Sequence, residues 1–224
     1  MGKPKENKKL AQAAESIFKK LIKAYPDPKT ALEFTTPLEL LVAVILSAQC
    51  TDQRVNAVTK TLFRKYRSAK DYAAAPQEEL EQDIRSTGFF RNKAKNIRAC
   101  CSILSDRYGG RVPDSMEELV ALPGVGRKTA NCVLGSAFGQ NAGIVVDTHV
   151  KRLAERLGLS REKDPDKIEA DLMKLVSQKR WHEFGNLLIL HGRSVCDARK
   201  ARCPECVLRN ECPSAEGFLK KFWN

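Results

Sequence analysis

The segment Leu122–Ala130, LPGVGRKTA, places two glycines, a proline and a lysine in one short stretch. A phosphate-binding P-loop has Gly directly before its Lys, in the pattern G-x-x-x-x-G-K-[ST]. Here Arg127 stands before the Lys, and no apolar strand leads into the turn. The preceding residues 114–121, DSMEELVA, combine an N-cap candidate with acidic first-turn residues, which predicts a short helix. Pro123 and Gly124 end that helix, and a second helix is expected to start near Arg127, so the segment is predicted to be a helix-hairpin-helix.

The net charge suggests what such a hairpin would contact. The chain has 224 residues, 42% hydrophobic and 29% charged, which is typical of a globular protein of one or two domains. Lys and Arg number 39 against 27 Asp and Glu, a net charge of +12. Excess positive charge favours phosphate backbones through counterion release. Glycines let the backbone approach another molecule closely, and helix N-terminal amides can point at a phosphate. The hairpin is therefore predicted to bind a DNA backbone.

Nothing in the sequence predicts a membrane segment. The basic N-terminus, MGKPKENKKL, is not followed by an apolar stretch of the kind a signal peptide contains. The longest apolar run, residues 38–48, is too short to cross a bilayer and indicates a buried helix. We expect a cytoplasmic monomer, associated with the nucleoid if the source is bacterial, and no membrane partner.

Hydrophobic periodicity predicts an all-α fold, since no alternating segment reaches strand length. Thr36 is the expected N-cap of the apolar helix that begins at Pro37, with Glu39 as its capping-box partner. Thr51 or Asp52 is expected to cap the next helix. The predicted helices span residues 11–25, 37–48, 52–66, 77–85, 92–107, 115–121, 127–138, 147–157, 165–177 and 181–192.

Four of the eight cysteines form a cluster near the end of the chain, spaced C-x6-C-x2-C-x5-C. Disulfides are rare in the cytoplasm, and a thiolate tetrad suits either zinc or a [4Fe–4S] cluster. The spacing alone leaves both metals open. The other four, Cys50, Cys100, Cys101 and Cys132, are predicted to be small buried hydrophobes inside apolar helices. The expected metal ligands are Cys196, Cys203, Cys206 and Cys212.

Between the first two of these ligands lies a basic loop, DARKAR, at residues 197–202. Its three cations could simply neutralise an anionic thiolate cluster in a solvated loop. They could also make the loop a metal-stiffened knuckle that contacts phosphate, and the two roles are compatible. The cations are Arg199, Lys200 and Arg202.

Two residues are candidates for chemistry. Lys128 lies in the first turn of a predicted helix, where the helix dipole and Arg127 both favour the neutral amine that a Schiff-base nucleophile requires. A phosphate-binding or surface lysine is the other interpretation. Asp147, in IVVDTH, could be a helix N-cap, or a carboxylate that stabilises positive charge on a sugar. Local sequence does not decide between these roles.

A family resemblance favours the chemical roles. The segments LPGVGRKTANCVL, VDTHVKRLAERLGL, LILHGRSVC and the cysteine spacing resemble the endonuclease III family, as do LLVAVILSAQCTD and STGFFRNKAKNI. Members of this family are bifunctional DNA glycosylases and abasic-site lyases of the helix-hairpin-helix superfamily. The resemblance covers residues 10–214. It implies two helical domains with a DNA-binding cleft between them, residues 30–140 with the hairpin, and residues 1–29 with 141–224 holding a [4Fe–4S] cluster.

The resemblance also implies a role for individual residues. Lys128 would attack C1′ of a damaged nucleoside and Asp147 would assist it, with removal of an oxidised pyrimidine followed by β-elimination. Gln49 and Phe89 would fill the space left by a flipped base, although Phe89 and Phe90 could equally be core residues. A monofunctional glycosylase and a non-catalytic DNA-binding module are the alternatives. The remaining expected contacts to double-stranded, damaged DNA are Gly124, Val125, Gly126, Arg127, Thr148, His149, Arg193, Arg199, Lys200 and Arg202.

Overall fold

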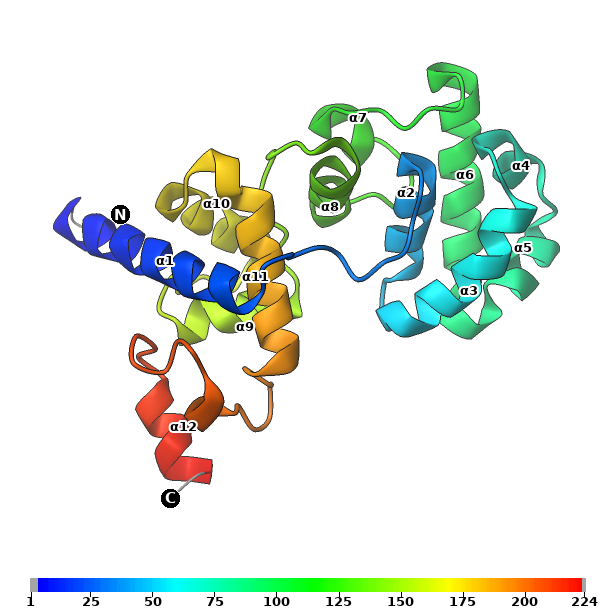
Figure 1. The fold of residues 1–224 in the computed structure, drawn as a ribbon. Helices are drawn as coiled ribbons and strands as arrows, with labels where there is room; N and C mark the ends of the chain where they lie inside the picture. Colours follow the sequence, from blue (N-terminus) through cyan, green and yellow to red (C-terminus); the bar gives the residue numbers. More distant parts are fainter. Residues whose placement is uncertain (1–3, 223–224) are drawn as a thin grey trace. The chain divides into compact units, whose positions relative to one another are not determined.

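The computed structural model describes residues 4–222, and none of them lies in a β-strand, which confirms the all-α prediction. Figure 1 shows the helices coloured in chain order, from blue to red. No helix within the described part of the chain has the length and apolar character needed to span a membrane. The α-helices are α1 Pro4–Ala24, α2 Pro37–Leu46, α3 Asp52–Lys65, α4 Ala69–Ala74, α5 Gln77–Asp83, α6 Phe90–Tyr108, α7 Met116–Val120, α8 Arg127–Phe138, α9 Thr148–Arg156, α10 Pro165–Leu175, α11 Trp181–Ser194 and α12 Ala215–Phe222, and the 3₁₀ turns are η1 Arg85–Thr87, η2 Gln178–Arg180 and η3 Cys203–Glu205.

The chain divides into two compact units, each with its own core. One unit is continuous and spans Thr30–Gln140. At its centre lies α2, whose residues Leu40 to Leu46 are all buried. Helices α8, α6 and α3 pack against α2, and α4 packs along α6. A helix that is apolar on every side must be covered on every side, so α2 organises this unit.

The other unit is discontinuous and is formed by Met1–Lys29 together with Asn141–Asn224. Helix α1 packs against α10 and α11, and α9 packs against α11. Its core includes Ile17, Leu21, Leu153 and Phe184, none more than 1% exposed. The apolar stripe predicted on the first helix is therefore buried by helices from the far end of the chain.

Helix ends follow local side-chain chemistry. The Thr36 hydroxyl accepts from the Glu39 amide at 3.2 Å, as expected of an N-cap. The capping box is shifted, however, because Glu39 accepts from the Thr35 amide at 2.6 Å rather than from Thr36. Thr35 is the better-placed donor since its hydroxyl also donates to the same carboxylate oxygen, at 2.7 Å. At the next helix Thr51, not Asp52, is the N-cap.

Several elements differ from the sequence prediction. Helix α2 ends at Leu46 instead of residue 48, because the chain enters a turn that contains the left-handed residue Gln49. Cys50 therefore lies in this turn and is half-buried, which contradicts its assignment to an apolar helix. Helices α4 and α12 were not predicted.

Candidate DNA repair site

The predicted hairpin is present between α7 and α8. Its turn is closed by the Val125 amide, which donates to the Leu122 carbonyl at 3.1 Å. Gly124 has φ 78°, a conformation that favours glycine, and an added Cβ would lie 2.9 Å from Asn96. Gly126 is the N-cap of α8, and a Cβ there would meet open space. The turn is therefore tight on its inner side and open at the start of α8.

Lys128 is the second residue of α8, and its side chain is exposed. Gly126 has no side chain to cap the first amides of this helix, so these N–H groups can bind an external anion. One turn later Cys132 is half-buried rather than fully buried as predicted, and burial raises the pKa of its thiol to about 11. The thiol therefore stays protonated at neutral pH.

Among the expected hairpin contacts, Val125 differs from its neighbours. Its side chain is 6% exposed and its amide is used within the turn. Gly124, Gly126 and Arg127 are exposed. A DNA contact through Val125 is thus restricted to its carbonyl, whereas the other three present their backbone or side chain to solvent.

Asp147 is the N-cap of α9. Its Oδ1 accepts from the amides of His149 at 2.8 Å and Val150 at 2.9 Å. The structural interpretation of Asp147 is therefore correct. Because both bonds involve Oδ1, they fix the carboxylate at the start of α9. Capping and a chemical role are compatible in one residue.

Gln49 and Phe89 share an unusual backbone conformation. They are the only non-glycine residues with positive φ in the described chain, at 52° and 47°. Gln49 is exposed, and Phe89 is 64% exposed, more than any other large hydrophobic side chain described. A left-handed conformation costs a non-glycine residue about 1–2 kcal/mol, and such strain is concentrated at functional sites. Core packing is excluded for Phe89, while Phe90 is partly buried.

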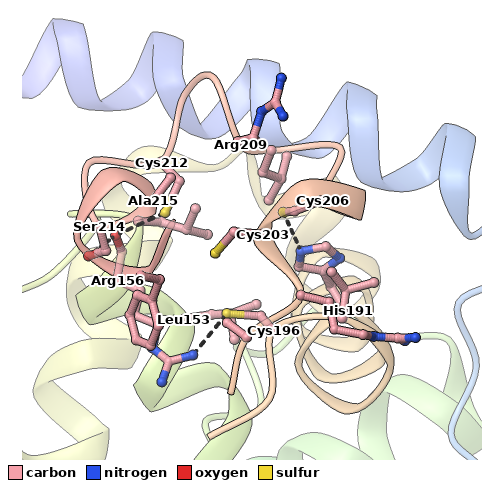
Figure 2. Close-up of a pocket in the computed structure, with 16 residues that line it drawn as sticks. Leu153, Arg156, His191, Cys196, Cys203, Cys206, Arg209, Cys212, Ser214 and Ala215 are labelled. Atoms are coloured by element: carbon pink, nitrogen blue, oxygen red, sulfur yellow. Dashed lines mark hydrogen bonds between the residues drawn. The ribbon is translucent and has the colours of Figure 1, made fainter. Parts of the chain in front are cut away.

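The four clustered cysteines line one pocket in the discontinuous unit (Figure 2). Burial raises the pKa of Cys203 and Cys212, and raises that of Cys206 to about 11. Buried thiols of this kind lose their protons when they bind a metal, which supplies the compensating charge. Within residues 4–222 no three potential ligands converge closely enough to hold a single metal ion. The thiols surround the pocket instead, and four such donors fit a thiolate-bound group.

Two residues at this pocket were missed by sequence reasoning. Arg156 donates to the Cys196 sulfur at 3.2 Å and to the Asp197 carbonyl at 2.7 Å. His191 is 2% exposed, and its Nε2 lies 3.3 Å from the Cys206 sulfur (Figure 2). Burial lowers the pKa of His191 to about 4, so the ring is neutral at pH 7. The sequence signal for both was weak: His191 follows an apolar run in α11, whereas Arg156 is one of several charged residues of α9.

The basic loop at residues 197–202 is organised by its own first residue. Asp197 Oδ1 accepts from the amides of Arg199 at 2.8 Å and Lys200 at 3.3 Å. Arg202 donates to the Ser194 carbonyl and pairs with Glu205 at 3.4 Å. Arg202 therefore stabilises the loop, whereas the side chains of Arg199 and Lys200 are exposed.

The remaining expected contacts lie on α9 and α11. Thr148 and Arg193 are exposed. His149 is half-buried, with Nδ1 3.1 Å from Arg152, and its Cβ packs against Gly192. His149 thus contributes to helix packing as well as lying near the start of α9.

Comparison with known proteins identifies the family. Residues 42–178 match the model of the HhH-GPD superfamily of base excision DNA repair proteins. An endonuclease III from Synechocystis sp. is 55% identical over 205 residues, which cover 92% of this chain and 94% of that protein. One from Bacillus subtilis is 49% identical, with coverage of 92% and 94%. The chain belongs to the endonuclease III family.

Solved endonuclease III structures match the fold over nearly its whole length. A non-covalent endonuclease III–DNA complex has a TM-score of 0.90 at 46% identity, covering 94% of this chain and 98% of that one. A trapped endonuclease III–DNA covalent intermediate has a TM-score of 0.89 at 47% identity, covering 92% and 97%. The helix-hairpin-helix fold inferred from the sequence is therefore confirmed.

Proposed function

We propose that this chain excises oxidised pyrimidines from double-stranded DNA and then nicks the strand, with Lys128 as the nucleophile. The observation that carries the proposal is an exposed lysine in the first turn of the hairpin helix α8, in a chain of the endonuclease III family. A solved endonuclease III relative was trapped as a covalent DNA intermediate, which is the chemistry that such a lysine performs.

A single amine, that of Lys128, is sufficient for both base removal and strand cleavage. The neutral Nζ of Lys128 attacks C1′ as the glycosidic bond breaks, and the bonding electrons leave with the base, which takes a proton. Loss of a proton from the nitrogen and opening of the sugar ring give an imine between Lys128 and C1′. Removal of a proton from C2′ then expels the 3′ phosphate by β-elimination. Hydrolysis of the imine releases the enzyme.

Asp147 is proposed to assist the first step in two ways, by stabilising charge on the sugar and by accepting a proton from Lys128. Positive charge develops on the sugar as the glycosidic bond lengthens, and a fixed carboxylate stabilises it. The hydrogen bonds from two backbone amides to Oδ1 already hold the carboxylate in place, so it does not have to reorganise during the reaction. Oδ2 is the oxygen we assign to the reaction, where it also accepts the proton that Lys128 loses.

Gln49 and Phe89 are proposed to enter the duplex and occupy the place of the flipped nucleotide. An exposed phenyl ring in a strained turn suits a wedge, because insertion buries apolar surface that is otherwise in water. The glutamine amide can hydrogen-bond to the unpaired base on the opposite strand. The proposed backbone contacts are the hairpin residues Gly124, Gly126 and Arg127, with Thr148, His149, Arg193, Arg199 and Lys200.

We further propose that the cysteine pocket holds a [4Fe–4S] cluster. Membership of the endonuclease III family implies an iron–sulfur cluster, and the four thiols line one pocket (Figure 2). When bound, the cluster would cross-link the 196–212 segment and offer no open position to water. The N–H of Arg156 beside Cys196 would stabilise the negative charge of that thiolate.

Borohydride trapping tests the proposed nucleophile. Protein is mixed with a duplex that carries thymine glycol, and sodium borohydride reduces any imine to a stable amine crosslink. The wild-type chain is expected to give a crosslinked band and Lys128→Ala none. Lys167→Ala is the matched control, since Lys167 is also exposed in the first turn of a helix. A crosslink with Lys128→Ala overturns the assignment.

The alternatives predict different products from the same duplex. A monofunctional glycosylase releases the base but leaves a strand that breaks only in alkali. A non-catalytic DNA-binding module does neither, and binds with a steep dependence on salt.

A further inference from the structure

The two left-handed turns that present Gln49 and Phe89 lie in the same unit, and one buried lysine joins them. Lys93, on α6, is 4% exposed. Its Nζ donates to the Leu46 carbonyl at 2.8 Å and to the Thr87 carbonyl at 2.8 Å. Leu46 is the last residue of α2, shortly before Gln49, and Thr87 is the last residue of η1, shortly before Phe89.

The hydrogen bonds from Lys93 to the two carbonyls are energetically favourable. The Leu46 carbonyl is among the last of α2 and has no partner further along the helix, so the lysine satisfies it. The ammonium also lies at the negative end of the α2 dipole, which favours a cation there. Burial lowers the pKa of Lys93, and this desolvation cost is offset by the two carbonyls. Removing the donor would leave buried carbonyls unsatisfied.

Lys93 also fixes the start of its own helix. Its backbone amide donates to the Phe89 carbonyl at 3.2 Å, the first bond of α6. One residue therefore holds the Phe89 turn through its backbone and through its side chain, and holds the Gln49 turn through its side chain alone. The Lys93 side chain therefore ties the end of α2 to the residue two positions before Phe89.

We propose that Lys93 is a positioning residue that sets the separation of Gln49 and Phe89, so that both enter the DNA in register at a damaged base pair. This inference rests on the proposed function. Lys93 has no contact with DNA in this scheme and acts through the two turns. Without its ammonium, each turn would relax from its left-handed conformation independently of the other.

A double-mutant cycle tests the proposal, with Lys93→Met in the wild-type chain and in the Gln49→Ala/Phe89→Ala background. Methionine keeps an unbranched apolar side chain at this buried position but donates no hydrogen bond. The probe is a duplex with 2-aminopurine opposite a tetrahydrofuran abasic analogue, whose fluorescence rises when the purine is unstacked. Excision of thymine glycol is measured in parallel under single-turnover conditions.

Lys93→Met is expected to remove most of the fluorescence rise and to slow excision about tenfold, but to have little further effect when Gln49 and Phe89 are already alanine. Equal slowing in both backgrounds would show a purely structural role and overturn the proposal, as would wild-type fluorescence in Lys93→Met. Lys95→Met, on the exposed side of α6, is the control and should match the wild type.

Two further measurements keep the test decisive. If Lys93→Met does not fold, Lys93→Gln, which retains N–H donors but reaches less far, is taken through the same cycle. The cycle between Gln49→Ala and Phe89→Ala needs no change at Lys93, and additive effects there contradict linked turns. Failure of the proposed function is distinguishable, because the wild-type chain would then release no base, whereas the abasic-analogue signal does not depend on chemistry.

Discussion

At the scale of single residues, one buried ammonium connects the ends of two turns that are far apart in the sequence. Lys128 and Asp147 are candidates because of residue type and local motif, and Gln49 because of the family resemblance. Lys93 is different, because its partners are carbonyls from distant turns. The signal for it was present: Lys93 continues the buried stripe of Ile97, Cys100 and Leu104 along α6. A lysine in register with an apolar stripe indicates a buried donor, but only a structure names the acceptors.

The two hairpin glycines are expected to respond differently to substitution by alanine. Gly124→Ala is expected to lower the free energy of unfolding by about 1–3 kcal/mol, since alanine is disfavoured at positive φ and would also clash with Asn96. Gly126→Ala is expected to leave stability nearly unchanged, because its Cβ meets open space, but to weaken DNA binding by occupying the room for a phosphate. Urea unfolding and fluorescence anisotropy measure the two quantities. Equal stability loss at both positions would contradict this division of roles.

At the scale of helices, caps were a better guide than periodicity. The starts of α2, α3 and α8 were expected from Thr36, Thr51 and the glycine turn, and the structure agrees. Helix α4 was missed because it is a short segment with no visible period. Its signal was the capping box: Ser68 accepts from the Asp71 amide, and Asp71 accepts from the Ser68 amide at 2.9 Å. Short helices are defined by their ends, and the ends are local chemistry.

Helix α4 provides the prediction at this scale. Ser68→Ala should destabilise the chain by about 1 kcal/mol through loss of the N-cap. Ser68→Asp should retain most of that stability, since aspartate caps equally well. Thermal unfolding of both variants beside the wild type is the measurement. No difference between alanine and aspartate would mean that packing against α6, not the cap, holds α4 in place.

At the scale of the whole molecule, the family resemblance predicted the class of protein, whereas cysteine spacing alone did not predict the metal. The +12 net charge favoured a polyanionic partner, and the chain proved to belong to a DNA repair family. Zinc and iron–sulfur remained open because ligand spacing along a loop does not fix the distances between sulfurs. Those distances depend on where α9, α11 and η3 place the loop, which is a property of the fold.

The cysteine pocket leads to a prediction about the metal content of the purified protein. Anaerobically purified protein is expected to be brown and to contain iron and acid-labile sulfide in equal amounts, with no zinc. Cys206→Ser should lose the colour and unfold at a lower temperature, because Cys206 packs against the core of the discontinuous unit. Cys50→Ser, in the other unit, is the control and should keep its iron. A colourless wild-type protein that contains zinc would reject the cluster.

The discontinuous unit has a consequence for how the protein is made. Helix α1 leaves the ribosome well before α10 and α11, the helices that bury its apolar face. The continuous unit at residues 30–140 can complete its own core in the meantime. Throughout that interval the stripe formed by Ile17, Phe18 and Leu21 stays exposed to water, so we expect the nascent chain to be most prone to aggregation until α10 and α11 emerge.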